Sequence, residues 1–142
     1  MPFRFLEGIA TADVAIEATG KTIEEAFAEA ALAMFEVQTN TKKIKPKTAK
    51  EVLIQSEDKK SLLFDWLSRL IYLRDVEKMF FSKFDVKIKK VNNRLKLSAK
   101  IYGEKINSKK HELKTEVKGV SYTQMEIEEK SNKCKIRVIL DV

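Results

Sequence analysis

The stretch from Phe84 to Ile101 alternates apolar and charged side chains with a period of two, and this pattern limits the folds open to the chain. Apolar residues recur at every second position up to Ile88 and again from Leu95 to Ile101, mostly with lysines between them. Asn92-Asn93 separates the two runs and tolerates the positive φ of a tight turn. The alternation is typical of strands with one buried face, so we predict an antiparallel β-hairpin.

A second hairpin is predicted near the end of the chain. Residues 117–128 and 134–140 flank a polar turn at residues 131–133. The last strand points Cys134, Ile136, Val138 and Leu140 to one face. Cys134 is therefore interpreted as a small apolar core residue.

Three shorter segments complete the predicted strands. Residues 3–6 and 14–18 are predicted as strands around a small-residue turn at 8–13, and residues 50–57 as a third strand. The polar stretch 39–47, which contains Pro46, is interpreted as a linker.

Two helices are predicted from their caps and apolar spacing. Thr22 is a good N-cap, Glu25 completes a capping box, and apolar residues then recur at three- and four-residue spacing up to Phe35. Asp58 caps a second helix over residues 59–75, with Trp66 on its apolar face.

This order of elements favours an α+β fold. Two helices are predicted to pack on one face of a mostly antiparallel β-sheet. With 142 residues, the chain is predicted to form a single domain over residues 1–142.

The charge is unevenly distributed along the chain. Residues 1–41 hold two basic and seven acidic side chains, a net charge of −5, so the remainder carries +12 of a total of +7. An excess of lysine favours phosphate-rich or acidic partners. It also describes an ordinary solvated surface, because no aromatic side chains interleave the lysines as base-stacking platforms would.

Composition argues against several classes of protein. One cysteine and one histidine, Cys134 and His111, give no disulfide within the chain and no cluster of soft metal ligands. No Gly-rich phosphate loop is present, and no pair of carboxylates has the spacing of an acid and a base. No apolar run approaches the ~18 residues of a membrane helix. We therefore expect a cytoplasmic protein, not bound to membranes, with no clear sign of an enzyme.

Two carboxylates stand apart by their context. Asp13 lies in a small-residue turn between two predicted strands, and Asp141 is followed at once by Val142 and its carboxylate. If the last strand runs beside the strand that opens at Val14, these oxygens would converge on a hard cation such as Ca²⁺ or Mg²⁺. The alternative is a turn aspartate that bonds its own backbone.

Six short motifs together resemble the archease family, and the likeness spans the whole chain. They are Thr11-Ala12-Asp13, Thr22 to Phe27, Tyr102-Gly103-Glu104, Lys110-His111-Glu112 with Lys114, Val117-Lys118 with Tyr122, and Leu140-Asp141-Val142.

The resemblance implies a small α+β protein that activates the RtcB-type tRNA-splicing RNA ligase by promoting its guanylylation and multiple turnover. It implies a divalent ion, usually assigned as calcium, with Mg²⁺ as an alternative, bound by Asp13, Asp141 and Val142. Lys118, His111 and Glu112 are implied as contacts for activation. Asp65 on the second helix is interpreted either as part of the same acidic surface or as an exposed helix carboxylate.

The chain departs from the family pattern at two histidines. Ala10 stands where the family usually has His, and Thr123 replaces another. The expected ion site is then made of oxygen alone, which suits Ca²⁺ or Mg²⁺. The resemblance therefore carries over no role for those two histidines.

Three functions remain open from the sequence. The first is the ligase activator, which meets tRNA only through the ligase. The second is a basic RNA-binding module that uses residues 42–142, and steep salt dependence would reveal it. The third is a general chaperone or a modulator of tRNA modification, which would need an exposed apolar patch.

Overall fold

The computed structural model describes residues 2–6 and 13–142, and the first of its two sheets contains the first and last strands, β1 and β7. This sheet has the order β1-β2-β7-β6, and every neighbouring pair is antiparallel. Its strands are β1 (Phe3–Leu6), β2 (Val14–Gly20), β6 (Gly119–Lys130) and β7 (Lys133–Asp141). The hairpin predicted near the end of the chain is confirmed as β6–β7. The turn predicted at residues 8–13 lies outside the described residues except for Asp13.

The second sheet contains the hairpin predicted from the alternating pattern. Its order is β3-β5-β4, again antiparallel, with β3 (Thr48–Ser56), β4 (Met79–Val91) and β5 (Arg94–Lys105). Asn92 and Asn93 both have positive φ, 51° and 63°, as the predicted tight turn requires. The strands are longer than predicted because Phe80 and Phe81 extend β4 and pack edge-on against Phe35.

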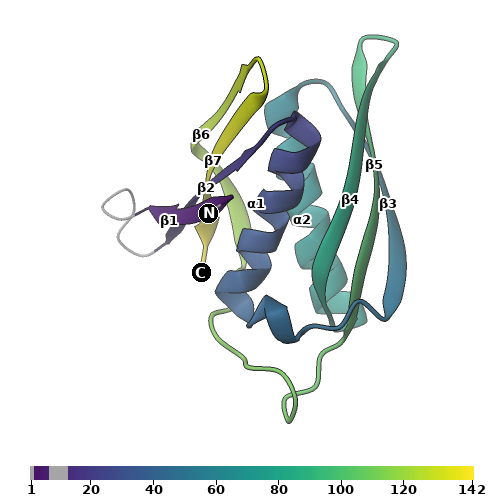
Figure 1. Ribbon diagram of the computed structural model, residues 1–142, viewed down its shortest axis with the longest axis vertical. Helices are drawn as coiled ribbons and strands as arrows, with labels where there is room; N and C mark the ends of the chain where they lie inside the picture. Colours follow the sequence, from purple (N-terminus) through teal and green to yellow (C-terminus); the bar gives the residue numbers. More distant parts are fainter. Residues whose placement is uncertain (1, 7–12) are drawn as a thin grey trace.

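The helices α1 (Ile23–Gln38) and α2 (Lys59–Glu77) lie between the two sheets, as Figure 1 shows. Helix α1 contacts β2 and β4, and α2 contacts β6 and β3. Each sheet turns one face to the helices, so the α+β class is confirmed. The strands form two sheets where one was predicted. Residues on several sides of α1, including Ala30, Ala33 and Phe35, are fully buried, and a helix that is apolar on more than one side needs cover on more than one side.

The helix caps follow the sequence with one difference. The Asp58 side chain accepts the Ser61 N–H at 2.8 Å, and Ser61 returns the bond, which completes a capping box. Thr22 caps α1 as predicted, but Glu25 accepts the N–H of Lys21 rather than that of Thr22. The reciprocal half of the predicted box is therefore displaced by one residue.

Two further predictions can be compared with the structure. The stretch 39–47 is not only a linker, because Thr41–Lys43 form a 3-10 turn whose cap, Asn40, accepts the Lys42 N–H at 3.2 Å. Cys134 is 2% exposed, and burial raises the pKa of its thiol to about 11, which confirms it as a core residue. Neither helix of the described chain is long and apolar enough to cross a membrane.

Candidate functional site

Two of the predicted ion ligands, Asp13 and Asp141, lie at the same end of the first sheet. Strand β2 pairs with β7 so that Val14 faces Leu140. Asp13 precedes Val14 and Asp141 follows Leu140, so the same antiparallel register places the two aspartates opposite each other. On the other side of β7, Gly119 faces Asp141.

Lys118 joins the same end through its main chain. Its N–H donates a 2.7 Å hydrogen bond to the carbonyl oxygen of Asp141. Its side chain is exposed and forms no ion pair within the described part of the chain. We call Asp13, Lys118, Gly119, Asp141 and Val142 the aspartate edge.

Gly119 leaves room beside the carboxylate of Asp141. A Cβ atom at position 119 would lie 3.4 Å from Asp141 Oδ2, so a side chain there would take up the space next to that oxygen. Both aspartates are exposed. The candidate donors are two carboxylates and the main-chain oxygens of Val142, and hard oxygen donors of this kind fit Ca²⁺ or Mg²⁺. Over residues 2–6 and 13–142, no three His, Cys, Asp or Glu side chains gather closely enough to hold a metal by themselves.

The segment from Ile106 to Lys118, between β5 and β6, approaches this edge and is fastened to the second sheet by Glu104. This carboxylate is 7% exposed. It accepts hydrogen bonds from Lys110 Nζ at 2.8 Å, from the Lys45 N–H at 2.8 Å and from His111 Nε2 at 3.1 Å. Burial alone would raise the pKa of Glu104, but these donors outweigh it and lower the pKa from 4.5 to about 2.

His111 is held in one tautomer by two opposed hydrogen bonds. Its Nδ1 accepts the Asn107 N–H at 3.0 Å, so the ring proton is on Nε2 and points to Glu104. The imidazole is 4% exposed and meets Phe80 edge-on. An effect of His111 on activation would therefore act through the segment that it anchors. Glu112, the next residue, is exposed.

Because of this network, the stability of the fold depends on pH in the acidic range. Because the pKa of folded Glu104 lies below 4.5, its ionised form contributes stability above that pH, and the contribution disappears as the pH falls toward about 2. Glu104→Gln is expected to lower the thermal midpoint near neutral pH and to flatten its decline in acid. Thermal unfolding across this range, with the exposed Glu112→Gln as control, checks the prediction. An unchanged acid limb in Glu104→Gln would contradict it.

The same segment also caps the end of α1. The N–H groups of Lys114 and Thr115 donate to the carbonyls of Gln38 and Val37 at 2.9 and 3.2 Å, which satisfies two acceptors that a helix end leaves open. Lys114 Nζ bonds Glu36 Oε2 at 2.9 Å. The family-like residues of this segment thus include its structural anchors.

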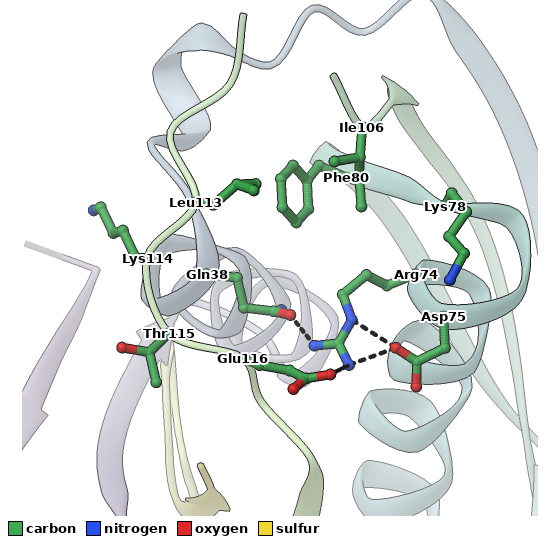
Figure 2. Close-up of a pocket in the computed structure, with 10 residues that line it drawn as sticks. All are labelled: Gln38, Arg74, Asp75, Lys78, Phe80, Ile106, Leu113, Lys114, Thr115 and Glu116. Carbon is green, nitrogen blue, oxygen red and sulfur yellow. Dashed lines mark hydrogen bonds and ion pairs between the residues drawn. The ribbon is translucent and has the colours of Figure 1, made fainter. Parts of the chain in front are cut away.

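A cleft of about 270 Å³ lies beneath this segment, and its central residue, Arg74, was not predicted from the sequence (Figure 2). Arg74 is 6% exposed, and its guanidinium donates to Gln38 and Asp75, with Glu116 3.8 Å away. The available signal was its position in line with the apolar face of α2, seven residues after Leu67.

Asp65 has its own hydrogen-bond partner, away from the residues named as the aspartate edge. It is half-buried on α2 and accepts a 2.6 Å hydrogen bond from Ser56 Oγ at the end of β3. Its neighbour Phe64 stacks on Tyr122 of β6 at 4.4 Å. In the described chain, no hydrogen bond or ion pair joins Asp65 to Asp141.

Comparisons with known proteins agree with the fold. Residues 3–142 match the Archease protein family. A protein archease from Sulfurisphaera tokodaii is 43% identical over 140 residues, covering 99% of this chain and 98% of that protein. The solution structure of Methanobacterium thermoautotrophicum protein 1598 aligns with a TM-score of 0.86 at 42% identity, over 99% of both chains.

A more distant crystal structure has the same architecture. The Thermotoga maritima protein described as "an archease, possible chaperone" aligns with a TM-score of 0.60 at 25% identity, over 94% of this chain and 93% of that one. With a family match over nearly its whole length and relatives above 40% identity, the chain belongs to the archease family.

Proposed function

We propose that this protein is a non-catalytic activator that docks on an RtcB-type tRNA-splicing RNA ligase and promotes its guanylylation and multiple turnover. The observation that carries the proposal is the aspartate edge, where the strand register brings Asp13, Asp141 and Lys118 together in a chain of the archease family. In this proposal, tRNA is met through the ligase.

The aspartate edge would hold a divalent cation, Ca²⁺ first and Mg²⁺ second. Asp13, Asp141 and the main-chain oxygens of Val142 would be its protein ligands, and the bound ion would supply positive charge at the docking edge. Ca²⁺ takes about six to eight oxygens, so water or the ligase would complete the set. Lys118, with its mobile ammonium group, would bind a phosphate or carboxylate on the ligase.

A chaperone role is the second candidate, because the Thermotoga maritima relative is described as a possible chaperone. The large exposed apolar side chains of this protein come from separate elements, including Phe5 of β1, Leu53 of β3 and Tyr72 of α2. Single apolar residues at a surface are common in soluble proteins and do not indicate a chaperone. We therefore favour the role of ligase activator over that of chaperone.

The test is multiple-turnover ligation by the RtcB-type ligase of the same organism, with the ligase limiting. Wild type is expected to raise the number of turnovers, and Asp141→Asn is expected to lose this effect and to bind Ca²⁺ more weakly in calorimetry. Asp85→Asn is the matched control, because Asp85 is an exposed aspartate on β4, in the other sheet. Equal stimulation by wild type and Asp141→Asn, or none by wild type, would overturn the proposal.

A further inference from the structure

The second sheet carries a strongly basic face on the side turned away from the helices. Buried residues of β5, such as Leu97 and Ala99, face the helices, and their neighbours in the strand point outward. We call the outward cations of this sheet the basic sheet face, and all of them are exposed. Its members are Lys83, Lys87, Lys89, Arg94, Lys96 and Lys100.

The strand register stacks like charges against each other. Lys89 of β4 lies directly opposite Lys96 of β5, and Lys87 follows two residues away on the same face. Like charges in this relation destabilise a sheet. From residue 86 to residue 100, the chain has basic side chains and no acidic one. Asp85 and Glu51 both lie beside Lys100, so they do not balance the positive charge at the end of the face near the β4–β5 turn.

These cations have no ion-pair partners in the described structure, in contrast to two arginines of the other sheet. On the first sheet, Glu17 accepts from Arg4 at 3.0 Å and from Arg137 at 2.9 Å, and these arginines lower the pKa of Glu17. On the basic sheet face, no cation joins an ion pair within residues 2–6 and 13–142, and Lys83 only lies over the ring of Tyr102. The described structure therefore shows no ion pair through which this concentration of charge would stabilise the fold.

We propose that the basic sheet face binds the phosphate backbone of RNA. The cations form a ladder along two strands, with about 7 Å between residues two apart in a strand, which suits a linear polyanion better than a compact anion. All but Arg94 are lysines, which contact phosphates as point charges rather than through the bidentate geometry that reads bases. The binding is therefore sequence-independent and strongly dependent on salt.

The basic sheet face and the aspartate edge are separated by the helical layer. The face belongs to the second sheet and the edge to the first, with both helices between them (Figure 1). RNA on this face would leave the edge free. The inference goes beyond the proposed activation of a ligase and does not require the ligase. It adds a direct contact with RNA, where the proposed function alone has tRNA met through the ligase.

The test is direct binding of the free full-length protein to tRNA and to an unrelated RNA of equal length, across a range of salt concentrations. Wild type is expected to bind both RNAs alike, with Kd in the range of about 10⁻⁴–10⁻⁶ M near physiological salt. Lys87→Gln/Lys89→Gln/Lys96→Gln should weaken binding at least about tenfold. It should also reduce the slope of log Kd against the logarithm of the salt concentration by the equivalent of about two to three phosphate contacts. Its thermal midpoint should be no lower than that of wild type, because the substitutions relieve like-charge repulsion.

The matched control removes the same charge elsewhere. Lys42→Gln/Lys43→Gln/Lys109→Gln changes exposed lysines of the 3-10 turn and the segment before β6, at the opposite end of the molecule from the β4–β5 turn in Figure 1. It should bind RNA nearly as wild type does. Equal losses in the two triple variants would mean that net charge alone attracts RNA and would overturn the proposal. So would no measurable RNA binding by wild type, or polyglutamate competing as well as RNA at equal charge, which would assign the face to an acidic protein.

Discussion

Gly103→Ala is expected to cost more stability than the same change at Gly20 or Gly119, the other glycines of the described residues. Gly103 lies in the central strand of the second sheet, where an added Cβ would be 1.9 Å from the carbonyl oxygen of Phe80 and 2.8 Å from the Cα of Phe81. Both neighbours are backbone atoms, so no rotamer change relieves the clash. The register of β4 shifts between Phe81 and Lys83, directly beside this contact, so the strand approaches the glycine at an irregularity.

The clash would spread into the core. Phe80 and Phe81 pack against Phe35 of α1, and a displaced β4 would open these contacts. We expect a loss of more than about 4 kcal/mol, out of the roughly 5–15 kcal/mol that stabilises a typical domain. This corresponds to a fall of at least about 10 °C in the thermal midpoint, or to a chain that does not fold.

Gly119→Ala is the matched control for this prediction. There the new Cβ would meet only the flexible carboxylate of Asp141, at 3.4 Å, so the change in stability should stay within about 1 kcal/mol. Thermal and denaturant unfolding of both variants against wild type make the comparison. A thermal midpoint for Gly103→Ala within a few degrees of wild type would contradict the close approach of β4 to Gly103.

The elements with local signals were predictable from the sequence. The hairpin turn at Asn92-Asn93 and the caps Thr22 and Asp58 are properties of a few consecutive residues, and the structure confirms all three. The 3-10 turn after α1 was missed because its signal, the cap Asn40, lies inside a polar stretch that resembles a linker.

The division of the strands into two sheets depends on contacts between distant segments. The apolar stripe of α1 predicted one covered face, whereas Ala33, on another side of the helix, is fully buried as well. Small residues tolerate close packing on any face of a helix, so their presence alone does not say how many layers cover it. Arg74 and Glu104 were not predicted as network centres, because their partners lie up to 59 residues away along the chain.

The candidate site also depends on contacts between segments that are far apart in the sequence. The idea that Asp13 and Asp141 meet required the first and last long strands to be neighbours, and the pairing of Val14 with Leu140 confirms that condition. His111 was expected to contact a partner, but its ring is buried against Glu104 and Phe80. A sequence motif alone does not show whether a residue holds the fold together or contacts a partner, since either role can require the same residue type at that position.

Lys118→Ala is expected to abolish ligase activation while leaving the fold intact. The hydrogen bond that Lys118 makes to Asp141 comes from the main chain and survives the substitution. The side chain is exposed, so its removal should change stability by no more than about 0.5 kcal/mol. If the ammonium group binds a phosphate or carboxylate on the ligase, its loss removes a charge-assisted contact at the docking edge.

Parallel measurements on one preparation separate this role from a structural one. Thermal unfolding and ligase guanylylation would be followed for wild type, Lys118→Ala and Lys114→Ala. Lys114 is a lysine of the same segment whose side chain bonds Glu36 within the molecule, so its loss should lower the thermal midpoint and affect activation less. Full stimulation by Lys118→Ala would show that this lysine is only a solvated side chain, and a lowered midpoint would show that it supports the fold. Only unchanged melting together with lost guanylylation assigns Lys118 to the contact with the ligase.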